Sequence, residues 1–154
     1  MIERTSDHDV LEGRFVLRNG REEIERAQDS VLEMIERRGY RRTSRFAVRL
    51  SMAEALANAL EHGNRNDPDK TVRLEIRIAR SWVVIEIEDQ GVGFDPQAVP
   101  DPARRENLDI PCGQGIVLMR AHMTEVEFPP PGNRVCMTYV RPAGSCGPKE
   151  PNGR

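Results

Sequence analysis

The sequence predicts an α/β (α+β) two-layer sandwich, in which a mixed, mainly antiparallel sheet is covered on one face by helices. Two patterns lead to this prediction. In several short segments apolar residues alternate with polar ones, which is typical of strands that bury one face. In other segments apolar residues recur every three or four positions, which indicates amphipathic helices. One-sided strands and striped helices must bury their apolar faces against each other.

Length and charge narrow the class of protein. The chain has 154 residues, with 25 Asp and Glu against 23 Lys and Arg, so its formal net charge is −2. We expect residues 1–140 to form a single domain and residues 141–154, which lack periodicity, to form a disordered tail. The balanced charge argues against direct binding to nucleic acid. No apolar run is long enough for a membrane span and the first residues do not form a secretory signal, so we expect a cytoplasmic protein with no membrane partner.

The first predicted elements are a strand and two helices. Branched and aromatic residues predict a strand over residues 10–17. A helical period of apolar residues follows over 22–38. A second, more apolar helix is predicted over 44–62, with Thr43 and Ser44 as its N-terminal cap.

A β-hairpin is the clearest pattern in the chain. Residues 72–78 and 83–88 each alternate apolar and polar side chains, and a short turn joins them. The Pro-rich, charged segment 95–113 has no such period and is predicted to be a long loop. The remaining predicted elements are a helix over 115–123 and strands over 126–128 and 135–140.

The second helix carries polar residues on one stripe of an otherwise apolar surface. Glu54, Asn58 and His62 are successive i, i+4 neighbours, so a carboxylate, an amide and an imidazole face the same way. Taken alone, this stripe is more typical of the solvated face of an amphipathic helix than of a functional site.

A glycine-rich segment follows the hairpin. It begins with Asp89 at the strand end and continues with Gly91, Gly93 and Phe94. Glycines at alternate positions allow positive φ angles and a close approach of the backbone to a ligand. The same residues also suit a plain turn, so the segment alone is a weak sign of function.

A second glycine-rich segment opens the predicted helix after the long loop. Gly113, Gly115 and Ile116 lie where the free N–H groups of a helix N-terminus can bind phosphate. No Gly-Lys-Ser/Thr sequence follows and no strand directly precedes the segment, so it matches neither a Walker loop nor a dinucleotide fingerprint.

The combination of the three motifs is far more specific than any one of them. In chain order they read E-x-x-x-N-x-x-x-H-G, D-x-G-x-G-F and G-x-G-I-x-L-M-R, and this combination resembles the GHKL (histidine kinase-like) ATPases, which have the Bergerat ATP-binding fold. Within that superfamily the chain is most similar to the anti-sigma factor serine-protein kinases. The phrases EALANALEHGN, DQGVGFDP and GIVLMRAHMTEVEF carry this similarity, which covers residues 10–140.

The resemblance implies a role for each motif. It assigns Asn58 to Mg²⁺ held against the phosphates of ATP, and Glu54 to the general base that accepts a proton from the attacking hydroxyl. Asp89 is the expected acceptor for the adenine amine, and Gly91 and Gly93 let the base approach the backbone. The other residues that we expect to contact ATP are His62, Phe94, Gly113, Gly115 and Ile116.

Two segments leave parts of this assignment open. The resemblance makes residues 95–112 an ATP lid, whose Arg104 and Arg105 either neutralise phosphate charge or form a solvated cluster. Members of the family usually have Gly-Thr before the last strand, with the threonine near adenine. This chain has Gly-Asn-Arg, with Asn133 in that place, and whether Thr138 substitutes is open.

The function that the resemblance implies is that of an ATP- and Mg²⁺-dependent serine kinase, which binds a sigma factor and phosphorylates an anti-anti-sigma partner with a STAS domain. It also implies a homodimer, which we expect to form through the first strand and its edge. A non-catalytic ATP-binding anti-sigma or adaptor module is the alternative, and the presence of Glu54 argues against it. A third reading is a detached histidine-kinase catalytic domain, but only His8 precedes the motifs, in a segment with no helical period.

Overall fold

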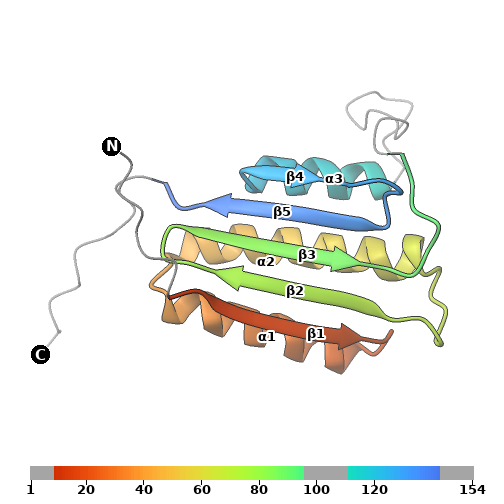
Figure 1. Ribbon diagram of the computed structural model, residues 1–154, viewed down its shortest axis with the longest axis horizontal. Coiled ribbons are helices and arrows are strands. Elements are labelled where there is room, and N and C mark those ends of the chain that lie inside the picture. Colours follow the sequence, from red (N-terminus) through yellow and green to blue (C-terminus); the bar gives the residue numbers. More distant parts are fainter. Residues whose placement is uncertain (1–8, 96–110, 143–154) are drawn as a thin grey trace, which may run out of the picture.

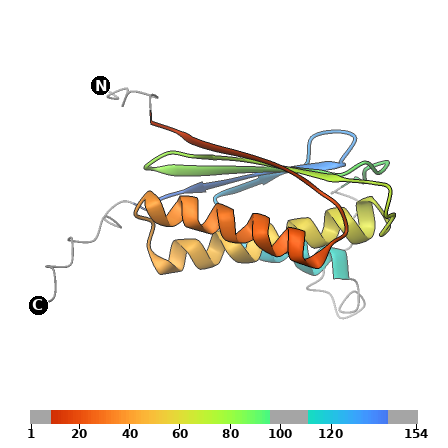
Figure 2. The ribbon, with the colours of Figure 1, turned by 90° about the horizontal axis from the view of Figure 1, so that it is seen from below.

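The computed structural model describes residues 9–95 and 111–142, which form one sheet and one layer of helices. In Figure 2 all the helices lie on the same side of the sheet, so the predicted two-layer sandwich is confirmed. In chain order (Figure 1) the elements are β1 (Leu11–Leu17), α1 (Arg21–Arg37), α2 (Arg42–Ala57), η1 (Asn58–Gly63), β2 (Val72–Ile78), β3 (Trp82–Glu88), α3 (Pro111–His122), β4 (Glu125–Glu127) and β5 (Arg134–Val140).

The sheet has the strand order β1-β2-β3-β5-β4. Each neighbouring pair is antiparallel, so the described strands form an antiparallel sheet where a mixed one was expected. The reason lies in the order: β3 and β4 run in the same direction, but β5 lies between them and pairs with both. The predicted hairpin is confirmed as β2 and β3, in which Leu74 faces Ile87 and Ile76 faces Ile85.

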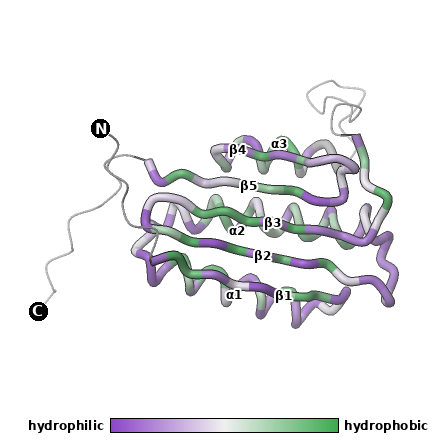
Figure 3. Tube along the Cα trace, viewed as in Figure 1, coloured by the Kyte–Doolittle hydropathy of each residue, from purple (hydrophilic) through white to green (hydrophobic). Residues whose placement is uncertain are grey.

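The core lies between the sheet and the helices. Every second side chain of β2 and β3 is buried, and Figure 3 shows the corresponding change of hydropathy along β2. Helix α2 is central to the helical layer, because it packs against α1, α3 and β3. The largest fully buried side chains are Ile35, Met52, Leu56, Leu74, Ile76, Ile78, Ile85, Ile87, Met119 and Met137, together with Val31 and Val48.

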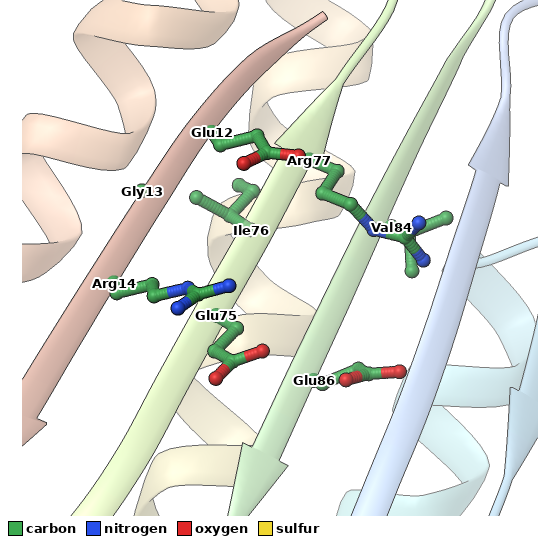
Figure 4. Close-up of a pocket in the computed structure, with 8 residues that line it drawn as sticks. All are labelled: Glu12, Gly13, Arg14, Glu75, Ile76, Arg77, Val84 and Glu86. Carbon is green, nitrogen blue, oxygen red and sulfur yellow. The ribbon is translucent and has the colours of Figure 1, made fainter.

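The opposite face of the sheet carries charged side chains. Figure 4 shows Glu12 and Arg14 of β1 beside Glu75 and Arg77 of β2, with Glu86 of β3 further along the same face. Arg14 stands opposite Glu75 and Glu12 opposite Arg77, and facing opposite charges stabilise an antiparallel pair. The hollow among these side chains measures about 40 Å³, which has room for a water molecule but not for a larger ligand.

The second helix differs from its prediction at both ends. It begins at Arg42 rather than Ser44, and the preceding Arg41 makes no side-chain cap bond. Ser44 is buried within the helix, and its hydroxyl shares a hydrogen bond of 2.7 Å with the hydroxyl of Tyr139. The predicted cap is therefore wrong, because a partner distant in sequence engages the Ser44 hydroxyl. At the other end the α-helix stops at Ala57, and the chain continues as the π-helical segment η1.

The last elements also have shifted boundaries. Helix α3 begins at Pro111 rather than at residue 115, so Cys112 and Gly113 lie within the helix and not in the predicted loop. Proline suits the first position of a helix, where its missing N–H would have no partner in any case. Strand β4 covers Glu125–Glu127, one residue earlier than its prediction.

Two predicted segments lie largely outside the described residues. Residues 96–110 hold most of the predicted lid, including Arg104 and Arg105, and residues 143–154 hold most of the predicted tail. Arg141, the first residue of that tail, packs its guanidinium 3.9 Å from the centre of a tyrosine ring in the α1–α2 connection. None of the described helices is long and apolar enough to cross a membrane.

Candidate functional site

A cavity of about 460 Å³ opens between the helical layer and one end of the sheet. Its walls come from α2 and η1, from the segment after β3, from α3 and from the connection between β4 and β5. This volume lies in the range of small-molecule binding sites. Of the residues predicted to bind ATP, the lining includes Asn58, His62, Asp89, Gly91, Gly93, Phe94 and Ile116.

The other predicted residues lie beside the cavity or in the same helix as its lining. Glu54 precedes Asn58 by about one turn of α2 and is not part of the lining. The first turns of α3 pack here, since a Cβ on Gly115 would lie 3.0 Å from Glu54 Oε2 and 3.2 Å from Asn58 Nδ2. Gly113 belongs to the same helix. The missing side chain of Gly115 thus lets α3 approach the polar stripe of α2.

The stripe itself does not continue with a regular α-helical turn. Asn58 begins η1, whose π-helical turn is wider than an α-helical one. The side chains of Asn58 and His62 are therefore not stacked one above the other, as the i, i+4 spacing in an α-helix predicted. Both side chains nevertheless line the cavity. Single π-turns are rare and occur frequently at functional sites.

Asp89 places a carboxylate at the end of β3. Its backbone N–H donates to the carbonyl of Asn133 at 2.9 Å, and its Oδ1 accepts the N–H of Gly91 at 2.8 Å. Burial raises the pKa of the Asp89 carboxyl, which the Gly91 hydrogen bond and the charge of Lys70 oppose. The carboxylate lies directly against Gly63 of η1, where any Cβ would collide with it. Gly63 is the last residue of the motif E-x-x-x-N-x-x-x-H-G, but no role could be predicted for it from the sequence, because its contact with Asp89 forms through the tertiary fold.

The glycine-rich segment after β3 interlocks with the connection between β4 and β5. Gly93 and Gly132 have φ angles of +82° and +91°, which favour glycine. A Cβ on Gly93 would collide with the Pro131 carbonyl oxygen, and one on Gly132 would collide with that of Phe94. The Phe94 ring also packs edge-on against Phe128 at a centroid distance of 5.1 Å. These contacts give the cavity an aromatic wall at this side.

Asn133, at the position where the resemblance led us to expect threonine, is part of the site. Its Nδ2 donates to the Asp89 carbonyl oxygen at 3.1 Å, and the residue lines the cavity. Thr138 faces Val84 across the β5–β3 pair, on the charged face of the sheet, away from the helices. The question left open by the sequence is therefore answered: Thr138 does not reach this cavity and Asn133 does.

Three cationic side chains in the lining were not identified from the sequence. Arg65 and Lys70 come from the loop between η1 and β2, and Arg134 begins β5. The segment between η1 and β2 is rich in turn residues, which do not indicate which side chains face a ligand.

The described residues contain no group of three or more His, Cys, Asp or Glu side chains that could hold a metal ion. The Asn58 amide oxygen can contribute one oxygen, and Mg²⁺ commonly combines one or two protein oxygens with phosphates and water. The residues present fit Mg²⁺ bound together with a nucleotide.

A half-buried carboxylate acceptor, glycines that allow close backbone approach, and an amide beside a glycine-bearing helix define a nucleotide-binding α+β domain. Comparison with known proteins identifies the family. The chain belongs to the histidine kinase-like ATPase domain family, which matches residues 18–139. The predicted membership in the GHKL superfamily is confirmed.

The curated relatives that match are named anti-sigma F factors. The one from Clostridium beijerinckii is 32% identical over 82 residues, which cover 52% of this chain and 57% of that protein. The one from Geobacillus stearothermophilus is 28% identical over 98 residues, covering 62% of this chain and 67% of that protein. The first of these matches spans little more than half the length of either protein.

Proposed function

We propose that this chain is an ATP- and Mg²⁺-dependent anti-sigma factor with serine kinase activity. It binds a sigma factor and phosphorylates a serine of an anti-anti-sigma partner with a STAS domain. Membership in the histidine kinase-like ATPase family supports ATP as the ligand of the cavity, and the names of the matching relatives support a sigma factor as a partner. A cytoplasmic location follows from this proposal, because sigma factors act on RNA polymerase there.

The cavity suits ATP in a defined orientation. The Asp89 carboxylate would accept a hydrogen bond from the adenine amine, and the backbones of Gly91 and Gly93, which also line the cavity, would contact the base. Asn58 and the N–H groups of the first turn of α3, where negative charge is favoured, would bind the phosphates. Asn58 would hold Mg²⁺ together with the phosphates, and the ion would supply neutralisation of their charge.

The position of Glu54 is the observation that carries the kinase proposal. Its carboxylate lies one turn from Asn58, at the end of the site opposite Asp89. Gly63, which touches Asp89, follows Glu54 by nine residues. This separation spans the last turn of α2 and all of η1, so in the proposed orientation Glu54 would lie on the side of the terminal phosphate.

Glu54 is suited to the proton transfer that serine phosphorylation requires. The serine oxygen forms a bond to the terminal phosphorus while the bond between that phosphorus and the bridging oxygen of ADP breaks. The carboxylate accepts the hydroxyl proton, and ADP leaves with the electron pair of the broken bond.

Incubation with labelled ATP and a cognate STAS protein tests the proposal. We expect phosphoserine with the wild type and at least ~100-fold slower transfer with Glu54→Gln, which keeps the shape but not the basicity of the side chain. Nucleotide binding should persist in both proteins. Bound ATP without any phosphoserine would contradict kinase activity.

A non-catalytic ATP-holding anti-sigma module is the second candidate, and one contact favours it. Gly115 of α3 approaches Glu54 Oε2, and Glu54 is not part of the lining of the cavity. This candidate predicts equal sigma-factor binding by the wild type and Glu54→Gln, with no transfer by either.

A homodimer is also part of the proposal. Strand β1 is the first strand of the sheet order and pairs only with β2 among the strands described, so one of its edges can receive a second strand. Analytical ultracentrifugation of the wild type tests this, and a monomer at all concentrations would contradict it.

A further inference from the structure

A buried amide side chain lies directly behind the candidate nucleotide site. Asn64 follows the last residue of η1 and is only 1% exposed. Burial of an amide is unfavourable unless its hydrogen-bonding groups are satisfied. Its partners therefore indicate what this side chain does.

Both ends of the amide are hydrogen-bonded to backbone groups of other segments. Oδ1 accepts the N–H of Gln90 at 2.8 Å, and Nδ2 donates to the Thr71 carbonyl at 3.0 Å. Gln90 completes the arrangement, since its Oε1 accepts the N–H of Thr71 at 2.8 Å. Asn64 thus joins the end of η1 to the start of β2 and to the segment after β3.

The backbone of Asn64 is held as firmly as its side chain. Its N–H donates to the Ala59 carbonyl at 2.8 Å, across the π-helical turn, and its carbonyl accepts the N–H of Asp67 at 3.0 Å. These two bonds fix the backbone of Asn64, so its side chain has a defined position from which it can hold the backbones of Gln90 and Thr71.

The partner at Oδ1 lies between two residues of the adenine end of the site. Gln90 follows Asp89, and the next residue, Gly91, donates its N–H to the Asp89 carboxylate. We propose that Asn64 is a positioning residue, which holds the turn of residues 89–91 against η1 and so orients the Asp89 carboxylate toward adenine. This inference rests on the proposed nucleotide-binding function.

Replacement of Asn64 by aspartate gives a test with a distinctive pH dependence. An ionised aspartate still accepts from Gln90 but cannot donate to the Thr71 carbonyl, whereas a protonated one can do both. Burial favours the protonated form, so the lost donor returns on mild acidification. We expect Asn64→Asp to bind Mg-ATP at least about tenfold more weakly than the wild type at pH 8, and less than about threefold more weakly at pH 5.5.

Two further measurements separate positioning from a general loss of stability. The ratio of ATP to GTP affinity, obtained by calorimetric titration with each nucleotide, should fall in Asn64→Asp at pH 8, because a misplaced Asp89 no longer selects the adenine amine. A purely structural role would reduce the affinity for both nucleotides equally. Asn66→Asp is the matched control, since it places the same charge on the same loop at an exposed position, and it should leave the ratio unchanged.

A second variant keeps the test decisive if Asn64→Asp does not fold. The Gln90 side chain is exposed, and Gln90→Ala removes one connection to Thr71 without opening the core. We expect it to lower the ratio of ATP to GTP affinity about threefold. An unchanged ratio in the folded variants, or a loss in Asn64→Asp that does not depend on pH, would overturn the inference. Failure of the wild type to bind either nucleotide would instead overturn the proposed function, and this inference with it.

Discussion

Replacement of Gly63 by alanine tests whether the contact between η1 and Asp89 controls nucleotide affinity. A Cβ at this position would overlap the carboxylate, with Oδ1 only 2.6 Å away. The carboxylate cannot move aside freely, because Oδ1 holds the Gly91 N–H at 2.8 Å and the Asp89 N–H donates to the Asn133 carbonyl at 2.9 Å. The substitution must therefore break the bond to Gly91 or move the end of β3 away from η1.

The size of the effect follows from the hydrogen bond that is displaced. A hydrogen bond to a charged group contributes about 1.5–3 kcal/mol, which corresponds to roughly 10- to 150-fold in a binding constant. Because Asp89 is proposed to make one such bond to the adenine amine, ATP affinity should fall at least about tenfold. Folding should suffer less, since alanine is about 1 kcal/mol more favourable than glycine inside a helix and offsets part of the collision.

Calorimetric titration with Mg-ATP and thermal melting followed by circular dichroism measure these two quantities. Gly20→Ala is the matched control, because a Cβ there would meet no atom closer than 3.6 Å. We expect the control to bind ATP as the wild type does. Wild-type affinity in Gly63→Ala, or equal losses in both variants, would refute the reasoning.

Three further outcomes are expected. Asn58→Ala should lose the Mg²⁺-dependent part of ATP affinity and keep its melting temperature, because the side chain lines the cavity and is not in the core. Titrations with ATP in the presence and absence of Mg²⁺ measure this. If Mg²⁺ raises the ATP affinity of the variant as much as that of the wild type, the metal assignment is wrong. Burial raises the pKa of Asp89, so wild-type ATP affinity should fall as the pH drops through that raised value, whereas Asp89→Asn should bind more weakly and show no such fall. Because the pKa of Asp89 is raised in the folded protein, this carboxyl stabilises the fold at pH values below its ordinary pKa, and the stabilisation is lost as the pH rises through the raised pKa. Melting temperatures of the nucleotide-free protein at a series of pH values check this. Glu54→Ala should bind ATP nearly normally while it phosphorylates the STAS partner at least ~100-fold more slowly, and full transfer activity would place the base elsewhere.

The elements that the sequence predicted well are those whose pattern arises from burial on one face. Leu74 and Ile76 alternate with charged residues because β2 has a core side and a solvent side, and this is a local property of the chain. Element boundaries depended on distant contacts instead. Ser44 looks like a helix cap, yet its hydroxyl bonds to Tyr139, 95 positions away in the chain. The antiparallel order of the sheet likewise follows from the position of β5, which no local pattern encodes.

In the candidate site, too, some features could be predicted from the sequence and others depend on contacts between distant segments. The motifs around Asn58 and Asp89 were recognised because their combination in chain order resembles the GHKL ATPases, and both residues line the cavity. Gly63 and Asn64 end the matching phrase EALANALEHGN, but their contacts could not be predicted, because each acts through a segment about 26 positions further along the chain, the separation between Asn64 and Gln90. A glycine at the end of a helix and an asparagine in a turn have ordinary local explanations, and only the fold places them against Asp89.

The two ends of this site are constrained to different degrees, as the proposed kinase, which must await a protein substrate, would require. At the adenine end, bonds from Gly91 and to Asn133 and the contact with Gly63 determine where the Asp89 carboxylate lies. At the other end, Glu54 makes no hydrogen bond or ion pair within residues 9–95 and 111–142, and Gly115 of α3 lies close to its carboxylate. A rigid adenine end allows ATP to bind before any partner arrives. In the proposed mechanism a serine hydroxyl would give the Glu54 carboxylate a hydrogen-bond donor and with it a fixed orientation, so transfer to protein would be favoured over premature hydrolysis.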